Sequence, residues 1–226
     1  MAHGTDALML FYGGTFDPVH LGHLAIARGA RDALQVPVRL MPAADPPHRA
    51  PPGADAGQRA RMLALAIAGE AGLLLDDREL QRAARDPGVP SWTVDTLLEL
   101  RAMVGAEQSL ALLLGADSLL GLPSWHRWEE LFALTHFVVA DRPGSELGAA
   151  LPPALARRLQ PAWTQEPRDL ACSPAGCVWR LEQPLRTESA TEVRRRIGAG
   201  GDWRSLLPAA VADYIADQRL YGFQAT

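Results

Sequence analysis

The sequence predicts an α/β fold built on a parallel sheet, and three observations lead to this expectation. Short apolar runs that read as strands alternate along the 226 residues with longer segments of helical spacing. The run Leu110–Leu114 is apolar at nearly every position, as is typical of a strand buried on both faces. A Gly-Gly turn joins the first strand to the first helix, where open α/β sheets bind ligands. We therefore expect a Rossmann-like, doubly wound parallel sheet with helices on both faces.

The strands are assigned from the short apolar runs and from the turn or loop residues that come after each run. The first run is followed by the Gly-rich turn, the second by a loop at 42–54 dense in Pro, Ala and Gly, and the third by Asp76 and Asp77. In chain order the expected strands are Leu8–Tyr12, Val36–Met41, Leu73–Leu75, Leu110–Leu114, Phe137–Ala140 and Val178–Leu181.

Helices are expected where apolar residues recur at helical spacing, as Met62, Leu65 and Ala66 do. Ser91 reads as the N-cap of a helix because a serine hydroxyl can accept a hydrogen bond from a free backbone N–H. The stretch Arg142–Gly176 is rich in Pro and poorly periodic, so we expect loops around one short helix there. The expected helices are about Gly22–Leu34, 57–69, from Ser91 to about Val104, a segment ending in Glu129–Leu134, about Ala154–Leu159, Ser189–Ile197 and Pro208–Gln218.

Composition limits the classes of function. A net charge of −4 argues against a general nucleic-acid binder, which is normally basic. All 22 basic residues are Arg, so chemistry that needs a P-loop or Schiff-base lysine is excluded. Two cysteines are too few for a disulfide scaffold or a four-thiolate zinc site. Neither a membrane-spanning run nor a signal segment is found, so a cytoplasmic location is the default, and no composition shift marks a second core.

The first motif lies at the end of the first strand, in the string from Gly13 to His23. Its two glycines let the backbone approach a phosphate, and the following helix offers free N–H groups and a positive dipole end. His20 and His23 are three residues apart, so both imidazoles could hydrogen-bond phosphate oxygens. Two alternatives compete, namely a metal site formed with Asp17 and a purely structural helix start.

The second motif is Ser189-Ala190-Thr191-Glu192-Val193-Arg194, just after the last expected strand. Ser189 and Glu192 fit an S-x-x-E capping box, which by itself explains the pattern in many proteins. Alternatively, the hydroxyls of Ser189 and Thr191, the free amides and Arg194 could hold a triphosphate.

Together the two motifs resemble the signatures of the nucleotidyltransferase superfamily with the H-x-G-H motif, and especially its bacterial nicotinate mononucleotide adenylyltransferases. The first match is Gly13-Gly14-Thr15-Phe16-Asp17-Pro18 followed by His20-Leu21-Gly22-His23, and the second is Ser189-x-Thr191-x-x-Arg194. The resemblance implies one nucleotidyltransferase domain over residues 1–226, in which a helical appendage at about 184–226 carries the second motif.

The resemblance also implies roles for individual residues around ATP. His20, His23 and Arg194 would be catalytic. The residues expected to bind ATP are Gly13, Gly14, Thr15, Phe16, Gly115, Asp117, Ser189 and Thr191. One departure is Glu188, which stands where the family usually has Ile; an acid beside a phosphate site is tolerated if it faces solvent.

Further segments match the mononucleotide side of the family. His48 lies in a Pro-His-basic string, although a solvated loop explains this string as well. Thr93 opens a helix whose first amides could bind the nicotinate carboxylate, and Trp92 stands where the family has Tyr. Trp125 could stack on the pyridine ring, or could simply be a large, partly buried residue. Asp17 is also assigned to the mononucleotide.

The activity implied by the resemblance is transfer of AMP from ATP to nicotinate mononucleotide, giving deamido-NAD and pyrophosphate in NAD biosynthesis. Mg²⁺ is expected as a cofactor bound through the ATP phosphates, with no side-chain ligand. ATP and the mononucleotide are the expected partners, without nucleic acid or membrane, and the oligomeric state stays open. Alternatives are an enzyme for nicotinamide mononucleotide or another phosphorylated cofactor precursor, and a non-catalytic nucleotide-sensing module of the same fold.

Overall fold

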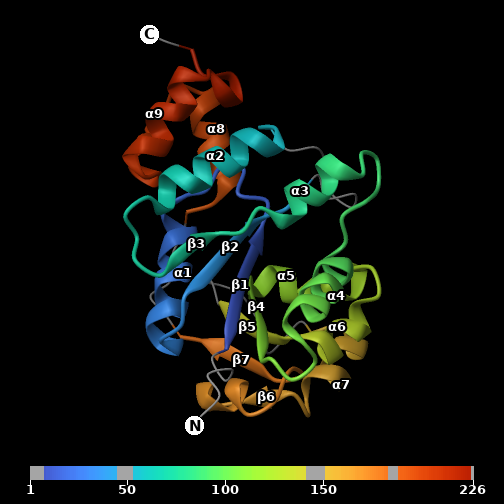
Figure 1. The fold of residues 1–226 in the computed structure, drawn as a ribbon. Helices are drawn as coiled ribbons and strands as arrows, with labels where there is room; N and C mark the ends of the chain where they lie inside the picture. The colour runs from blue at the N-terminus through green and yellow to red at the C-terminus, as the bar shows by residue number, and fades with distance from the viewer. Residues whose placement is uncertain (1–7, 45–52, 141–150, 183–187, 225–226) are drawn as a thin grey trace.

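The computed structural model describes residues 8–44, 53–140, 151–182 and 188–224 (Figure 1). In this part of the chain, seven strands form one parallel sheet in the order β3-β2-β1-β4-β5-β7-β6. The strands are β1 (Met9–Gly14), β2 (Val38–Pro42), β3 (Leu73–Leu75), β4 (Leu110–Gly115), β5 (His136–Ala140), β6 (Trp163–Thr164) and β7 (Val178–Leu181). The prediction of an α/β fold with a parallel sheet is confirmed.

Helices connect the strands, and further helices follow the last strand. The α-helices are α1 (Leu21–Leu34), α2 (Ala56–Ile67), α3 (Arg78–Arg85), α4 (Thr93–Val104), α5 (Ala116–Leu120), α6 (Trp128–Leu134), α7 (Pro153–Leu159), α8 (Ala190–Gly198) and α9 (Ala209–Asp217). Short 3₁₀ helices are η1 (Leu122–Ser124), η2 (Pro167–Ala171), η3 (Arg204–Leu206) and η4 (Leu220–Gly222). Among the described residues, no helix combines the length and apolar character needed to cross a membrane.

The sheet separates two hydrophobic cores, one on each face. Along β4, Ala111 and Leu113 belong to the core that α1, α2, α8 and α9 cover. Leu110, Leu112 and Leu114 belong to the other core, which α4, α5, α6 and α7 cover. The strand is therefore buried on both faces, which explains its continuous apolar sequence. The doubly wound arrangement follows the prediction, and α9 lies beside α2 in Figure 1.

The sheet reverses its winding direction between two neighbouring central strands. β1 pairs with β2 on one side and with β4 on the other, and the chain leaves β3 to enter β4. The carboxyl ends of β1 and β4 therefore lie next to each other at a topological switch point, where open α/β sheets bind ligands. Gly13 and Gly14 end β1, and Gly115 ends β4.

Several elements differ from the prediction. β1 includes Gly13 and Gly14, which the sequence pattern assigns to a turn, because both still pair with β2. Trp92, not Ser91, is the N-cap of α4, and the Ser91 hydroxyl instead accepts a hydrogen bond from Arg82 at 2.6 Å. The unpredicted elements are α3, α5, β6 and the 3₁₀ helices. The stretch around α7 thus contains β6 and η2 as well as loops.

Candidate active site

The start of α1 holds the two histidines of the first motif against each other. His20 is the N-cap, with extended backbone angles, and His23 lies at the third helical position. The backbone N–H of His20 donates to Nδ1 of His23 at 3.3 Å. The two imidazoles are stacked, with their centroids 3.7 Å apart and their planes 29° apart. Although the helix begins after His20 and not before it, the rings still lie side by side.

Neighbouring residues of the motif determine where these rings can lie. A Cβ on Gly22 would be 3.0 Å from Nδ1 of His20, so the imidazole occupies space that only glycine leaves open. Phe16, with a φ of 50°, packs its ring edge-on against His23 at 5.0 Å. A Cβ on Gly14 would in turn lie 3.0 Å from the Phe16 ring. The glycines thus make room for a packed aromatic cluster.

Asp17 is a buried carboxylate that joins segments far apart in the sequence. Oδ2 accepts from the backbone N–H of Gly53 at 2.8 Å, and Oδ1 accepts from that of Ala54 at 3.1 Å. The hydroxyl of Tyr221 also donates to Oδ1, at 2.8 Å. Arg194 donates through Nη1 to the backbone oxygen of Asp17 at 2.6 Å and lies 3.5 Å from Oδ2. The first motif is therefore tied to the second and to the C-terminal segment.

The second motif begins α8, but only half of the expected capping box forms. Ser189 is the N-cap, and its hydroxyl accepts from the N–H of Glu192 at 3.2 Å. The Glu192 side chain instead accepts hydrogen bonds from Arg195 and Arg196, which lower the pKa of its carboxyl to about 2. Glu188, just before the cap, is half-buried and does not face solvent freely; its Cβ packs near Gly22.

Both motifs line one cleft of about 600 Å³ at the carboxyl edge of the sheet. The beginnings of α1 and α8, far apart in sequence, converge there, so that His20, His23 and Arg194 share one cavity. All residues predicted to bind ATP line the same cleft, namely Gly13, Gly14, Thr15, Phe16, Gly115, Asp117, Ser189 and Thr191. Two helix N-termini and an arginine suit an anionic ligand with several phosphates.

A second cavity of about 120 Å³ adjoins the cleft and is more apolar. The two share the lining residues Gly13, Gly14, Thr15 and Ser118, so they meet at the end of β1. Thr93, the first residue of α4, and Trp125 line the smaller cavity as predicted for the mononucleotide. The positive end of the α4 dipole thus lies at this cavity, where it can attract a carboxylate.

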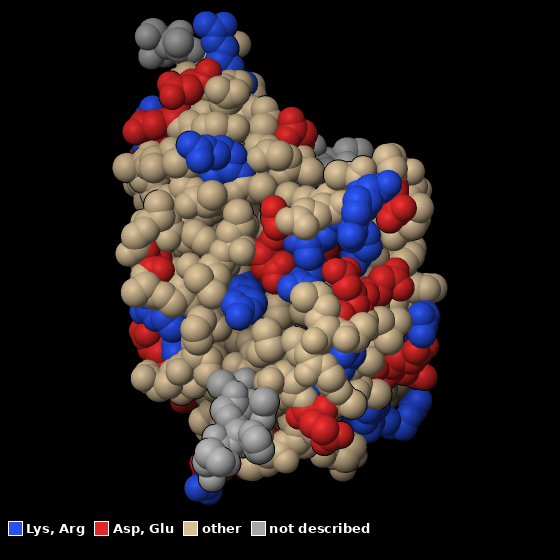
Figure 2. All heavy atoms as spheres, viewed as in Figure 1, with Lys and Arg blue, Asp and Glu red and all other residues tan. Residues whose placement is uncertain are grey.

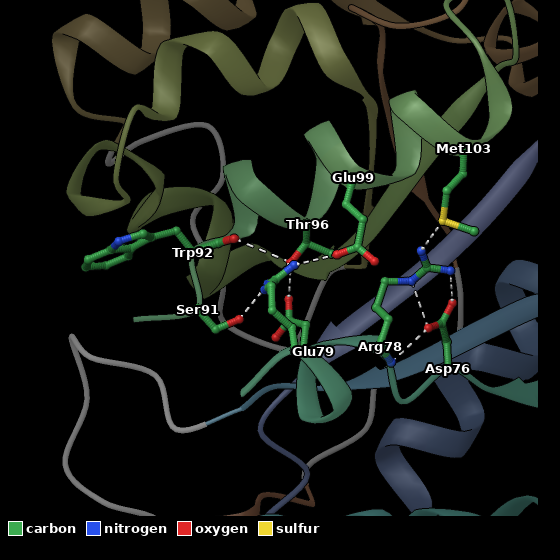
Figure 3. A network of polar contacts seen from close by, with 9 residues as sticks. Asp76, Arg78, Glu79, Ser91, Trp92, Thr96, Glu99 and Met103 are labelled. Carbon is green, nitrogen blue, oxygen red and sulfur yellow. Dashed lines mark hydrogen bonds and ion pairs between the residues drawn. The ribbon is translucent and has the colours of Figure 1, made fainter. Parts of the chain in front are cut away.

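Asp17 and Trp92, which are also predicted for the mononucleotide, are not among the described residues that line the smaller cavity. Asp17 lines the large cleft, and its carboxylate is bound by protein donors. The indole of Trp92 packs against His126 at 4.9 Å and, in Figure 3, points away from the polar network around Thr96. His48 lies outside the described residues.

The structure adds residues that the sequence patterns did not single out. The buried Arg59 donates to the backbone oxygens of Thr15 and Ala43, at 3.0 and 2.6 Å, and so fixes the turn after β1. Ser118 lines both cavities and directly follows Asp117, which the sequence assigns to ATP binding, so its position next to a predicted site residue was an available signal. Glu79 lines the smaller cavity, and Tyr221 contacts Asp17; neither has a local sequence signal.

Charged side chains near the smaller cavity are paired with one another. Asp76 binds Arg78, and Glu99 binds Arg82, at 2.8 and 2.9 Å. Figure 2 shows acidic and basic side chains intermixed on this face. Among the described residues, no group of three or more His, Cys, Asp and Glu side chains could hold a metal ion.

Comparison with known proteins agrees with this site. A family described as cytidylyltransferase-like matches residues 11–196. A protein of Stenotrophomonas maltophilia named "Probable nicotinate-nucleotide adenylyltransferase" is 63% identical, covering 95% of this chain and 97% of the relative. A Xylella fastidiosa protein of the same name is 51% identical, covering 96% and 97%.

A solved structure shares the fold at low identity. The nicotinic acid mononucleotide adenylyltransferase of Plasmodium falciparum, complexed with NaAD, aligns with a TM-score of 0.72 over 96% of this chain and 98% of the other, at 16% identity. With two relatives above 50% identity over nearly their full length, and with both motifs on one cleft, this chain belongs to the nicotinate-nucleotide adenylyltransferase family.

Proposed function

We propose that the protein transfers AMP from ATP to nicotinate mononucleotide, giving deamido-NAD and pyrophosphate. The observation that carries this proposal is the pair of joined cavities at the carboxyl edge of the sheet. The larger is lined by two helix starts and by the three candidate catalytic side chains, His20, His23 and Arg194, and the smaller by the start of α4 and Trp125. A cleft with two helix N-termini, joined to a smaller cavity with an aromatic side chain, suits a triphosphate beside a flat aromatic carboxylate.

In this reaction an oxygen of the mononucleotide's 5′-phosphate attacks the α-phosphorus of ATP. A new phosphorus–oxygen bond forms as the bond to the β-phosphate oxygen breaks, and pyrophosphate leaves with the electron pair. Phosphoryl-type transfers need positioning and charge neutralisation more than covalent help. No side chain has to act as a nucleophile.

The histidines would supply hydrogen-bond donors to the phosphates. Because Nδ1 of His23 accepts a hydrogen bond from the backbone, the neutral ring carries its proton on Nε2. That Nε2–H is then a donor at neutral pH. His20, held against His23 by ring stacking, would contribute a second imidazole to the same anion.

Arg194 would neutralise charge that develops on the phosphates. Its Nη1 is anchored on the backbone oxygen of Asp17, while a guanidinium has five N–H donors in a planar fork. The remaining donors can bind phosphate oxygens together with the hydroxyls of Ser189 and Thr191, which line the same cleft.

Mg²⁺ would be carried mainly by the ATP phosphates. Of the carboxylates that line the described cleft, Asp17 already accepts three hydrogen bonds, so the protein offers few oxygens to an ion. When bound, such an ion supplies charge neutralisation on the pyrophosphate leaving group. Asp117, exposed in the same cleft, would lie near the nucleotide.

Recognition of the mononucleotide would rest on the smaller cavity. The first amides of α4 at Thr93 would bind the nicotinate carboxylate, and Trp125 would contact the pyridine ring. His48 and Trp92 remain predictions for this substrate.

The proposal is tested by incubating the protein with ATP, Mg²⁺ and nicotinate mononucleotide, and measuring deamido-NAD and pyrophosphate. Parallel reactions with nicotinamide mononucleotide measure the preference between acid and amide. We expect both products in equal amounts and a higher kcat/KM for the acid. ATP binding without pyrophosphate release would overturn the proposal and point to a nucleotide sensor.

A His23→Ala variant tests the phosphate site within the same assay. Loss of one well-placed donor is expected to lower kcat about a hundredfold. Circular dichroism should show an unchanged fold, because the imidazole lines a cleft and lies outside the two cores. A kcat close to that of the wild type would contradict the assignment.

A further inference from the structure

Glu79 is a buried acid in the wall of the smaller cavity. It lies in the first turn of α3, and only 8% of it is exposed to solvent. Among the described residues that line this cavity, it alone has an ionisable acidic or basic side chain. Burying a carboxyl group away from water is costly unless its oxygens find donors. The contacts of the Glu79 carboxyl group therefore indicate the role of this side chain.

Donors from two different parts of the fold meet at the Glu79 carboxyl group. The hydroxyl of Thr96, in the first turn of α4, donates to Oε1 at 2.8 Å. The backbone N–H of Ala44, just beyond β2, also hydrogen-bonds to this carboxyl. Glu79 thus links the end of β2 to the beginning of the helix that supplies Thr93.

Arg82, three residues after Glu79 on α3, orients this network through hydrogen bonds. Its Nη2 donates to the hydroxyl oxygens of Ser91 and Thr96, both at 2.6 Å. Because Thr96 accepts from Arg82, its own proton is directed to Glu79. Glu99 pairs with Arg82 at 2.9 Å and balances its charge. The residues before and within the first turn of α4 are therefore held by one connected set of hydrogen bonds.

The charge balance of the cavity is compatible with an anionic ligand. Burial raises the pKa of the Glu79 carboxyl, and the hydrogen bond from Thr96 and the charge of Arg82 oppose this increase. Asp76 acts in the same direction as burial. The hydrogen bond and the nearby guanidinium thus offset part of the negative charge that Glu79 brings to this wall.

We propose that Glu79 is a positioning residue for the mononucleotide, because its carboxyl group holds the end of β2 and the start of α4 at the spacing that the pyridine site requires. This inference rests on the proposed function. Glu79 acts through Ala44 and Thr96, so its loss should disturb mononucleotide binding far more than ATP binding in the larger cleft.

The test compares Glu79→Gln with the wild type in steady-state kinetics, with each substrate varied in turn. Glutamine has nearly the same size, but its amide NH₂ can only donate, so one of the two donors loses its acceptor. An unsatisfied buried donor is costly, and we expect the KM for nicotinate mononucleotide to rise about tenfold. The KM for ATP and kcat should stay within about twofold of the wild-type values.

Thr96→Val provides a second variant that removes only the hydroxyl. We expect it to raise the same KM, and the effect of the double variant to fall short of the sum of the two single effects, because both changes act on one connected set of hydrogen bonds. Glu70→Gln is the matched control: it is the same acid-to-amide change, but it affects the pair with Arg28 and lies outside the lining of both cavities. Its KM values should match those of the wild type.

The inference is overturned if the wild type is active but the Glu79→Gln and Thr96→Val variants both have the wild-type KM for the mononucleotide. It is also overturned if both KM values rise together, since that would indicate general loosening of the structure. Should Glu79→Gln fail to fold, Thr96→Val decides alone. A wild type that forms no deamido-NAD would instead refute the proposed function.

Discussion

Gly22 illustrates how a missing side chain positions a functional one. The imidazole of His20 lies where a Cβ at position 22 would come within 3.0 Å of Nδ1. Alanine suits a helix better than glycine, by about 1 kcal/mol, so the change itself does not weaken α1. It does force the His20 ring, and with it the stacked ring of His23, to move.

Gly22→Ala is therefore expected to lower kcat at least tenfold, since a displacement of catalytic groups by about 1 Å can be that costly. Thermal unfolding should show a midpoint close to that of the wild type. Gly198→Ala, in α8, is the matched control because its Cβ would meet its nearest neighbour at 3.9 Å. Equal kcat values for both variants would show that His20 has room to adjust.

His136 has a structural role that its buried surroundings explain. Nδ1 accepts from the backbone N–H of Cys177 at 2.9 Å, and Nε2 is 2.8 Å from the backbone oxygen of Ser173, to which it donates. Both nitrogens are thus engaged in the neutral ring, as expected for a histidine that begins a buried strand. Burial lowers the pKa of His136 below its ordinary value of 6.5, although the Ser173 contact opposes this shift.

The expected result in an NMR titration is a midpoint for His136 below pH 6.5. Because the folded state resists protonation at this ring, the unfolded state binds more protons as the pH falls. The stability from the neutral ring is therefore complete above pH 6.5 and decreases as the pH falls below 6.5 toward the folded-state pKa. A midpoint at or above 6.5 would contradict this account.

At the scale of elements, η4 holds the two phosphate-binding motifs in place. Tyr221 donates to Asp17, which accepts two backbone N–H groups as well. Burial and the nearby Asp17 charge raise the pKa of Tyr221, so the phenol keeps its proton and remains a donor. With its oxygens occupied, Asp17 keeps Oδ2 at 3.5 Å from Arg194, and the guanidinium remains available to a ligand.

Tyr221→Phe should raise the KM for ATP about fivefold, which corresponds to the loss of one ordinary hydrogen bond. Asp17 would have one donor fewer, so its carboxylate would attract Arg194 more strongly and compete with ATP for the guanidinium. Tyr214→Phe is the control. Tyr214 of α9 is partly buried and, like Tyr221, packs against the core that α1, α2, α8 and α9 cover. If the two variants have the same KM for ATP in steady-state kinetics, the proposed role of η4 is wrong.

Elements with a strong apolar period could be predicted, and the remainder lacked such a signal. β4 and α1 could be predicted from the sequence because buried strands and helices each need apolar residues at a characteristic spacing. α3 consists mostly of charged and polar residues, and only tertiary contacts place its Glu79 in a cavity. β6 has two residues and depends on pairing with β7. The polar face of α3 and the turns at the C-terminal end of the described chain carry no local sequence pattern that marks them as part of a site.

At the scale of the whole molecule, strand order creates the site. The sequence places Gly14 and Gly115 after apolar runs, but not beside each other; the pairing of β1 with β4 does that. The convergence of α1 and α8 likewise depends on β7 lying in the same sheet as β1. The family signatures implied one site for ATP, whereas the separate smaller cavity and the contacts of Asp17 required the tertiary structure.

The C-terminal segment is packed as part of the larger structure, although the sequence predicts it as an appendage. Val193 of α8 and Val211 and Ile215 of α9 belong to the same buried core as Leu10 of β1 and Leu24 of α1. Asp17 adds polar links between α8, η4 and the first motif. Residues 188–224 should consequently not unfold before the sheet does.

We expect urea denaturation to show one transition, with the same midpoint by far-UV circular dichroism and by tryptophan fluorescence. ATP should shift this single transition upward, because a ligand that binds only the folded state at a hundred times its Kd adds about 2.7 kcal/mol. Hydrogen exchange should slow in α1 and α8 together, since the cleft joins their first turns. An early transition confined to residues 188–224, or ATP protection of α1 alone, would mean that the two motifs do not act on one ligand.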